Sequence, residues 1–273
     1  MRCCLVILAI GLALRAASGD ILVTAGSSYT GQVVKVNGTG VGIKVGENEF
    51  TVALPSIVRA EIAKPDAVEK SLTAFRAGKN AEALTGFKSV AERYAGLPLP
   101  WAEESLLRLG DTQLALKDYA GAKKTFDTVK GYYPDKAPML EAKYARILFA
   151  QGQPDKAMQT VQAALDPLLK RDYLTDEQEA AVADGLVLLG DCLVAAGKLD
   201  EALDDYLKVV TLFDVDPDQT IEAKYKAAKL FEQGGKWRRA KQTYDELLKE
   251  NPNAVVAEDA KKRLADLTKA HPE

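Results

Sequence analysis

Hydrophobic positions follow two different periods along the chain, and the change falls at Lys64-Pro65. In residues 20–63 apolar and polar positions alternate, as at Val41, Ile43 and Val45, which is the pattern of a strand with one buried face. After Pro65 the apolar positions recur at helical spacing to the end of the chain, and alanine, leucine, lysine and glutamate dominate. The sequence therefore predicts a small β module over residues 20–63 and a helical region beyond it.

The β module contains the turn signals that a set of short strands needs. Asn37-Gly38 separates two apolar runs, and both residues accept the positive φ of a tight hairpin turn. Pro55-Ser56 separates two later runs, one through Phe50 and one that ends at Ile62. Four or five short strands in this length predict a small barrel. By strand count and turn placement it resembles an SH3-like or Sm-like barrel.

The helical region carries one signature five times, a small alanine followed four residues later by a large side chain. The five pairs are Ala83 with Phe87, Ala122 with Phe126, Ala157 with Val161, Ala202 with Tyr206, and Ala240 with Tyr244. Successive alanines lie 35 to 45 residues apart, close to the period of about 34 residues found in arrays of helical hairpins. Five residues before four of these alanines stands a glycine that predicts the turn between paired helices, at Gly78, Gly152, Gly197 and Gly235.

Two Leu-Gly pairs extend the signature, because Gly110 and Gly190 each follow a leucine and lie twelve residues before a signature alanine. Together these residues resemble the tetratricopeptide repeat family, and the resemblance covers roughly residues 65–273. It implies a mostly α fold, an α-solenoid of about five helical hairpins over residues 64–252, closed by a capping helix and tail over residues 253–273. An unrelated amphipathic bundle is the alternative, but a bundle gives no reason for this order of residues to repeat.

The small residues of the signature have a physical role. Where the two helices of a hairpin cross, only a small side chain lets the backbones approach. The large side chain four residues on lies on the same helix face and fills the space beside the crossing. We therefore expect all ten signature residues to be packing residues.

The first nineteen residues have the composition of a secretory signal peptide. Arg2 precedes an apolar run from Cys3 to Leu14, and the small residues Ala16-Ala17-Ser18-Gly19 follow. The run is shorter than the roughly 20 residues that cross a bilayer, so an uncleaved anchor is the minor alternative. We therefore expect an exported protein, periplasmic or associated with the cell envelope, without a transmembrane span.

Composition narrows the class of partner. The formal net charge is -3, so the chain lacks the basic excess that binding to a phosphate backbone requires, and nucleic acid is not an expected partner. Removal of the signal peptide leaves Cys192 as the one cysteine, so no internal disulfide is expected. We expect protein partners.

Residues able to carry catalysis are scarce, and we predict no catalytic, cofactor-binding or metal-binding residues. The one histidine, His271, lies near the C-terminus and is expected to be a tail residue, where order is least expected. Cys192 has no histidine to activate it and is expected to be packed. Asp214, Asp216 and Asp218 alternate like calcium ligands, but the glycine and the final glutamate of a calcium loop are missing, so a helix-capping loop is favoured. We expect that the protein is not an enzyme.

In the tetratricopeptide repeat family, the first helix of each pair lines a concave groove. In register, the resemblance implies a partner groove lined by Leu107, Asp111, Arg146, Phe149, Val187, Asp191, Tyr225 and Lys229. Members that clamp an acidic peptide terminus use lysine, arginine and asparagine, and Asp111 and Asp191 depart from that pattern. The alternative is that these charges pair across adjacent helices and bind nothing.

Two repeat ends, Glu92-Arg93-Tyr94 and Gly131-Tyr132-Tyr133-Pro134, make the array similar to periplasmic repeat proteins of the Tol-Pal system and of outer-membrane assembly. This similarity implies a non-enzymatic scaffold or adaptor in the bacterial cell envelope, which binds a segment of a partner protein in the concave groove. The alternative is that the β module binds cell-wall glycan or another ligand and that the helical array is a spacer.

Overall fold

The computed structural model describes residues 19–272, so the predicted signal segment, residues 1–19, lies outside the described residues except for Gly19. The described residues divide into two compact units, residues 19–63 and residues 64–272. The division lies where the hydrophobic period changes in the sequence.

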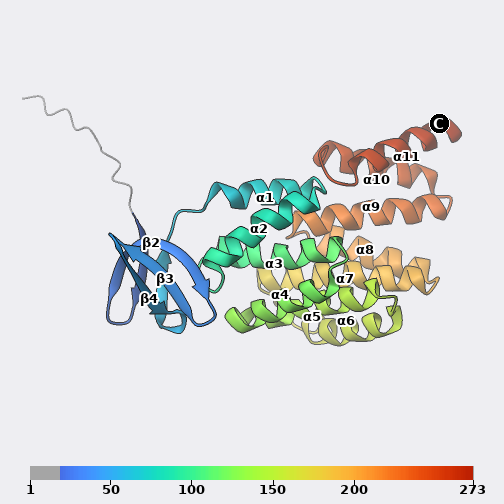
Figure 1. Cartoon of the computed structure of the whole chain (residues 1–273). Helices are drawn as coiled ribbons and strands as arrows, with labels where there is room; N and C mark the ends of the chain where they lie inside the picture. The colour runs from blue at the N-terminus through green and yellow to red at the C-terminus, as the bar shows by residue number, and fades with distance from the viewer. Residues whose placement is uncertain (1–18, 273) are drawn as a thin grey trace, which may run out of the picture. The chain divides into compact units, whose positions relative to one another are not determined.

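The N-terminal unit is a five-stranded antiparallel sheet, which confirms the predicted small β module (Figure 1). Its strands are β1 (Asp20–Thr24), β2 (Ser28–Asn37), β3 (Gly40–Val45), β4 (Asn48–Ala53) and β5 (Ile57–Glu61), and the short 3-10 helix η1 (Leu54–Ser56) precedes β5. The hydrogen-bonded order is β4-β3-β2-β1-β5, with β4 and β5 as its two ends. The Asn37-Gly38 turn joins β2 to β3, and Gly38 has a φ of 61°. Leu22, Val33 and Ile43 are fully buried on one face of the sheet.

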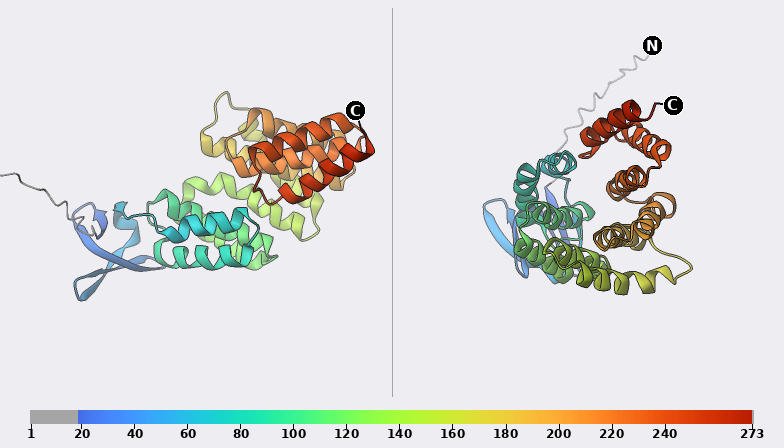
Figure 2. Two further views of the ribbon diagram at one scale, coloured as in Figure 1. Left: turned by 90° about the horizontal axis from the view of Figure 1, so that it is seen from above. Right: turned by 90° about the vertical axis from the view of Figure 1, so that its right-hand side faces the viewer.

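The second unit is an array of paired helices. The α-helices found among residues 64–272 are α1 (Asp66–Arg76), α2 (Asn80–Tyr94), α3 (Pro100–Ala115), α4 (Tyr119–Tyr132), α5 (Ala137–Ala150), α6 (Pro154–Leu169), α7 (Asp176–Ala195), α8 (Leu199–Leu212), α9 (Pro217–Gln233), α10 (Trp237–Glu250) and α11 (Ala257–Ala270), and the 3-10 helix η2 (Pro134–Lys136) precedes α5. Successive helices pack as five hairpins, from α1 with α2 to α9 with α10, and α11 packs on α10 (Figure 2). This confirms the predicted solenoid of five hairpins with a closing helix.

The repeat signature lies at the contact inside each hairpin. All ten signature residues are at most 2% exposed: Ala83, Phe87, Ala122, Phe126, Ala157, Val161, Ala202, Tyr206, Ala240 and Tyr244. A Cβ atom on Gly110 would lie 2.3 Å from the ring of Phe126, and one on Gly190 would lie 2.4 Å from the ring of Tyr206. In these two hairpins the aromatic ring of the second helix therefore lies directly on the glycine of the first helix, and any side chain there would force the helices apart.

The turn within each hairpin contains a residue in the left-handed conformation. Four of the five are the predicted turn glycines, Gly78, Gly152, Gly197 and Gly235, with φ between 69° and 77°. Glycine adopts this conformation at no steric cost. The second hairpin has Lys117 at the same position, with a φ of 61°. A lysine there carries the strain that a Cβ atom brings to left-handed backbone.

The end of the chain is packed more closely than its sequence indicates. The capping helix begins at Ala257 rather than at Asn253, because the preceding segment forms a turn in which asparagine, proline and β-branched valine are poor helix formers. The expectation that His271 is a tail residue is wrong, since its ring stacks on Trp237 with ring centroids 4.2 Å apart. Lys241 also donates a hydrogen bond to the carbonyl oxygen of His271 at 3.0 Å. These contacts hold the C-terminal end of α11 against α10.

Candidate partner-binding surface of the repeat array

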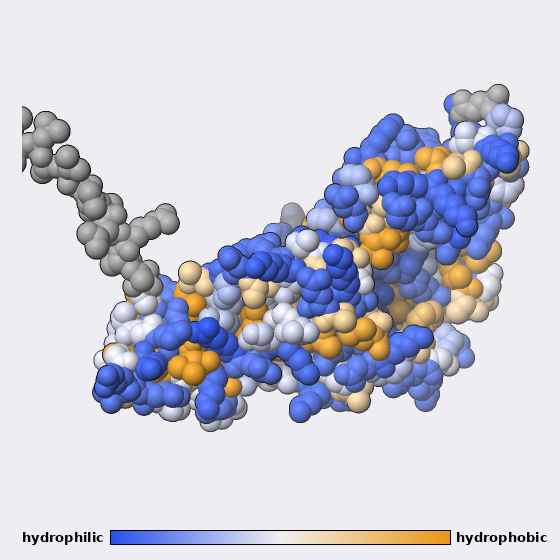
Figure 3. Space-filling view, turned by 45° about the horizontal axis from the view of Figure 1, so that its top comes forward, coloured by the Kyte–Doolittle hydropathy of each residue, from blue (hydrophilic) through white to orange (hydrophobic). Residues whose placement is uncertain are grey.

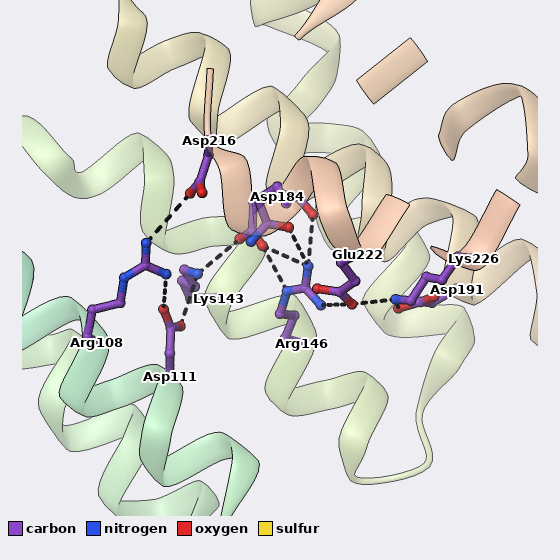
Figure 4. Close-up of polar contacts among 10 residues, drawn as sticks. Arg108, Asp111, Lys143, Arg146, Asp184, Asp191, Asp216, Glu222 and Lys226 are labelled. Carbon is purple, nitrogen blue, oxygen red and sulfur yellow. Dashed lines mark hydrogen bonds and ion pairs between the residues drawn. The ribbon is translucent and has the colours of Figure 1, made fainter. Parts of the chain in front are cut away.

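Charged side chains from the first helices of four hairpins meet on one side of the array (Figure 4). They come from α3, α5, α7 and α9, and α7 packs against both α5 and α9. A spacing of three or four residues puts the charges of one helix on one face. We call this set the inner ionic network; it consists of Arg108, Asp111, Lys143, Arg146, Asp184, Asp191, Glu222 and Lys226.

Asp184 lies at the centre of the inner ionic network and is 5% exposed. Its Oδ1 accepts hydrogen bonds from Arg146 Nε at 2.9 Å and contacts Arg146 Nη2 at 2.7 Å. Its Oδ2 accepts no hydrogen bond, but Lys143 Nζ lies 3.4 Å away and also lies 3.0 Å from Asp111. A charge withdrawn from water is tolerated only when it is paired, and each of these charges is paired across neighbouring helices.

The pairing decides the protonation state of the buried groups. Burial alone would raise the pKa of Asp184, but Arg146 and Lys143 outweigh it and lower that pKa from 3.8 to about 2. Burial alone would lower the pKa of Arg146 and of Lys143, but Asp184 beside Arg146 and Asp111 beside Lys143 outweigh it and raise both pKa values. These groups therefore stay charged at neutral pH, and the network is a set of fixed ion pairs rather than a source of acid-base chemistry.

The network continues through α7 to α9. Lys226 Nζ lies 2.6 Å from Asp191 and 2.5 Å from Glu222. The hydroxyl of Tyr206, one of the signature aromatics, donates a hydrogen bond to Asp191 at 2.7 Å. Burial raises the pKa of Glu222, but Lys226 and Arg146 outweigh it, so that this pKa is lowered. The core contact of the fourth hairpin is thus joined to the charged surface by one carboxylate.

At the other end, Arg108 joins the network to the N-terminal end of α9. Its guanidinium lies 3.8 Å from Asp111, 3.8 Å from Asp216 and 3.3 Å from Asp218. The same group lies over the ring of Phe75, 5.6 Å from the ring centroid. Burial lowers the pKa of Arg108, and the surrounding carboxylates outweigh it and raise that pKa.

Half of the eight predicted groove residues are already paired or buried within the chain. Asp111, Arg146 and Asp191 belong to the inner ionic network, as the alternative of charges paired across helices describes. Val187 is fully buried in the core and has no side-chain surface to offer a partner, so its assignment to the groove is wrong. Val187 is enclosed because α7 packs against both α5 and α9.

The other predicted groove residues retain partial exposure. Leu107 and Phe149 are half-buried, and Phe149 packs against the same core as Val187. Tyr225 is half-buried and its hydroxyl donates a hydrogen bond to Asp259 of α11. Lys229 Nζ lies 5.5 Å from the centroid of the Tyr225 ring.

A pocket of about 670 Å³ opens beside Tyr225, and we call it the terminal pocket. Its apolar lining comprises Phe75, Ile221, Tyr225, Val255 and Val256, and its amide side chains are Asn80, Asn251 and Asn253. Its charged side chains are paired with one another or with a neighbour, as in Lys224 with Glu250 at 2.5 Å. The pocket therefore offers mainly apolar and uncharged polar surface.

Sequence reasoning does not single out the terminal pocket, apart from Tyr225. Phe75, Ile221 and Val255 lie on three segments far apart in the chain, and no local motif connects them. The one sequence signal is the pair Val255-Val256, which is apolar although it follows the polar stretch Asn251–Asn253.

The remaining residues considered for chemistry have structural partners. Asp216 caps α9 by accepting a hydrogen bond from the backbone N–H of Asp218 at 2.9 Å, and Asp214 accepts one from the hydroxyl of Thr220 at 2.6 Å. Cys192 is buried, and burial raises the pKa of its thiol to about 11. In residues 19–272, no group of three or more His, Cys, Asp or Glu side chains could hold a metal ion. Over the same residues, none of the helices has the length and apolar character to cross a bilayer.

Comparison with known families places the chain in a class. A family described as tetratricopeptide repeat-like domain matches residues 62–227, and one described as tetratricopeptide repeat matches residues 222–254. The chain belongs to the tetratricopeptide repeat-like family. Proteins of this family are generally non-catalytic scaffolds, and the fold is that of a protein-protein interaction scaffold.

Several solved structures are similar to this chain. A thermophilic tetratricopeptide repeat protein from Thermus thermophilus is 19% identical with a TM-score of 0.52, covering 74% of this chain and 97% of that chain. A MamA fragment from Desulfovibrio magneticus RS-1 is 20% identical with a TM-score of 0.35, covering 68% and 96%. YrrB, a tetratricopeptide repeat protein described as having an unusual peptide-binding site, is 20% identical with a TM-score of 0.37, covering 72% and 90%. The first likeness shows the fold, and the lower TM-scores of the others carry no further argument. No curated protein matches the chain.

Proposed function

We propose that this chain is a non-enzymatic scaffold that is exported to the cell envelope and binds a segment of a partner protein at the terminal pocket. The observation that carries the proposal is a contrast between two parts of one surface. The inner ionic network is paired to itself, whereas the terminal pocket leaves apolar side chains open to solvent, including Val255 at 62% exposure. Figure 3 presents a mainly hydrophilic face that is hollowed, with hydrophobic residues gathered beside the hollow.

The pocket fits a partner segment with an uncharged apolar anchor. Its volume accommodates one or two large side chains, and an anchor buried in such a pocket supplies most of the affinity in many protein interfaces. The amides of Asn80, Asn251 and Asn253 offer donors and acceptors to the backbone of an extended peptide. Since the charged groups of the lining are already paired, a partner with an acidic terminus would have to break existing ion pairs, and a neutral segment would not.

Partner recovery from an envelope fraction tests the pocket. Val255→Glu places a charge in the pocket, and it should lower the recovery of a cross-linked partner by about tenfold, which corresponds to about 1.4 kcal/mol. Leu212→Glu is the matched control, because Leu212 is an aliphatic residue of similar exposure, 67%, outside the pocket. Equal recovery with the two variants would exclude the terminal pocket as the binding site.

Export is tested separately. The apolar run and small residues of the first nineteen positions support cleavage after Gly19, so mature protein from an envelope fraction should begin at Asp20. Intact-mass measurement and N-terminal sequencing of the fractionated protein check this. A chain that retains Met1 and remains in the cytoplasmic fraction would contradict the envelope role. This result would not contradict partner binding at the terminal pocket.

The β module is a second candidate for ligand binding, such as cell-wall glycan. Phe50 on β4 and Val58 on β5 are 47% and 65% exposed, and both strands end the hydrogen-bonded order of the sheet. An exposed aromatic ring is a common stacking surface for apolar faces of ligands. Phe50→Ser should reduce retention on purified cell wall if the β module carries the binding. Unchanged retention, together with loss of partner recovery in Val255→Glu, would assign the function to the helical array.

A further inference from the structure

The N-terminal end of α9 contacts the first two hairpins of the array through Asp216, its N-cap residue, and Asp218, in its first turn. Arg76 Nε, at the end of α1, lies 3.5 Å from Asp218, and Arg108 of α3 lies 3.3 Å from Asp218 and 3.8 Å from Asp216. In a repeat array, each hairpin packs mainly on its neighbours in sequence. These ion pairs instead connect the start of the fifth hairpin with the first and second hairpins.

The first hairpin also approaches the turn before α11 at the terminal pocket. A Cβ atom on Gly78, in the turn of the first hairpin, would lie 3.5 Å from the side chain of Val255, in the turn before α11. Figure 2 shows α1 and α11 close to one another at the two ends of the arc that the helices form. Phe75, Arg76 and Asp218 all line the pocket, so these contacts across the array also form its wall.

The ion pair of Arg76 with Asp218 is of the kind that solvent and salt weaken. The side chain of Arg76 is 54% exposed and that of Asp218 is 23% exposed. Pairs with this exposure contribute little stability each, and salt screens them. Arg108 is less exposed, at 15%, and its position over Phe75 keeps it facing Asp216 and Asp218. The array therefore closes across the pocket through these ion pairs and the approach of Val255 to Gly78, whereas the packing within each hairpin is apolar.

We propose that Asp216 and Asp218 form a clasp with Arg76 and Arg108, which holds the array closed across the terminal pocket, and that the array opens there when these pairs are released. Opening requires only a small rotation at each of several hairpin interfaces, which leaves every hairpin intact. A partner segment enters the pocket in the open state, and the clasp sets the fraction of molecules that are open. This consequence for binding rests on the proposed function, but the clasp itself does not.

A distance measurement within the array tests the clasp without any partner. Lys79→Cys and Asn253→Cys place spin labels beside Gly78 and Val255, and both positions are exposed. Cys3 and Cys4 are replaced by serine, while Cys192 is buried and stays unlabelled. Raising NaCl from about 0.1 M to about 1 M shortens the Debye length from about 10 Å to about 3 Å. The distance distribution should shift to longer distances and broaden. In the background Asp216→Asn with Asp218→Asn, which keeps an oxygen at the cap of α9, it should be long at both salt concentrations.

The matched control removes two carboxylates elsewhere in the same array. Asp204→Asn with Asp245→Asn breaks two exposed pairs on α8 and α10 and should leave the wild-type distance and its salt response unchanged. One distribution shared by the wild type, the clasp variant and both salt concentrations, with circular dichroism unchanged, would overturn the clasp. If the clasp variant opens but Val255→Glu recovers as much partner as Leu212→Glu, the clasp stands and the proposed binding at the pocket fails. If Val255→Glu lowers recovery but the open clasp variant recovers as much partner as the wild type, opening is not required for binding.

Discussion

Arg146 on α5 holds Asp184 on α7 through two nitrogen atoms, since Nε and Nη2 lie 2.9 Å and 2.7 Å from the same carboxylate oxygen. Both residues lie on first helices of successive hairpins, so this pair connects the hairpins beside the apolar core that they share. A buried ion pair adds little net stability compared with apolar packing, but loss of one partner leaves an unpaired charge in a site poor in water. The inner side of the array is therefore sensitive to the removal of any single charge.

Neutralising Asp184 should destabilise the fold strongly. Asp184→Asn leaves Arg146 and Lys143 without their shared carboxylate, and we expect the free energy of unfolding to fall by about 3 kcal/mol. Urea denaturation followed by circular dichroism measures it. Asp204→Asn is the control, because Asp204 is 67% exposed, and it should change the free energy of unfolding by less than about 0.5 kcal/mol. Equal effects of the two substitutions would show that the network contributes no more than a surface pair.

The lowered pKa of Asp184 also predicts how the free energy of unfolding depends on pH. The pKa of Asp184 in the folded protein is about 2, below its ordinary value of 3.8, so its contribution is fully present above about pH 4 and is lost as the pH falls toward 2. The lowered pKa accounts for about 2 kcal/mol. The pKa of Lys143 is raised above 10.5, so its contribution is present below that pH and is lost as the pH rises through the raised value. Unfolding free energies measured across this range should fall on the acid side, and less steeply in Asp184→Asn.

In the second hairpin, the close approach of Gly110 to Phe126 predicts that an added methyl group lowers the free energy of unfolding, and a control position predicts the opposite effect. Gly110→Ala would place a Cβ atom 2.3 Å from the ring of Phe126, and we expect the free energy of unfolding to fall by about 1–3 kcal/mol. Gly131→Ala lies in α4 with open space around the new atom, and it should raise the free energy of unfolding by about 0.5–1 kcal/mol through helix propensity. Thermal melts of the two variants measure both effects. A Gly110→Ala variant as stable as the wild type would mean that the hairpin can widen without loss of stability.

The hairpins could be predicted from the sequence because their signature is local. A turn glycine, a small residue in the first helix, and an alanine followed by an aromatic in the second all act within one unit of about 34 residues. Gly110 against Phe126 shows the principle, since each residue is recognisable by its place in the repeat and the contact follows from the pairing of two adjacent helices.

The pocket and the clasp could not be predicted, because they depend on how small rotations add up over successive repeats. Arg76 and Asp218 belong to different hairpins with no shared motif, and their meeting follows from the curvature of the whole array. The inner ionic network could be predicted only in part. The register of Asp111, Arg146 and Asp191 identifies the helix face on which they lie, but the closeness of the first helices, which pairs those charges and buries Val187, does not follow from it.

The C-terminal ring stack should stabilise α11. His271→Ala removes a ring that lies nearly parallel to Trp237, with an angle of 8° between the ring planes, and should cost about 0.5–1.5 kcal/mol. Because the stack lies at the end of the helix, the loss should appear first as faster amide exchange in α11 rather than as a lower global melting temperature. Lys269→Ala, at an exposed position of α11 outside the stack, is the control for a change of helix sequence alone. Equal exchange rates in the two variants would show that the stack does not hold the helix.

The turn of the second hairpin should be improved by the glycine that the other four hairpins use. Lys117 has a φ of 61°, which costs a residue with a Cβ atom about 1 kcal/mol, and its side chain is exposed. Lys117→Gly relieves that strain but increases the flexibility of the unfolded chain, so we expect a net gain of about 0.5 kcal/mol in the free energy of unfolding. Gly152→Lys makes the reverse change at the same position of the third hairpin, where φ is 77° and open space surrounds the site, and should lose about 1 kcal/mol. Chemical denaturation measures the free energy of unfolding of both variants. If Lys117→Gly destabilises the protein, contacts of the lysine stem must outweigh the backbone strain at this turn.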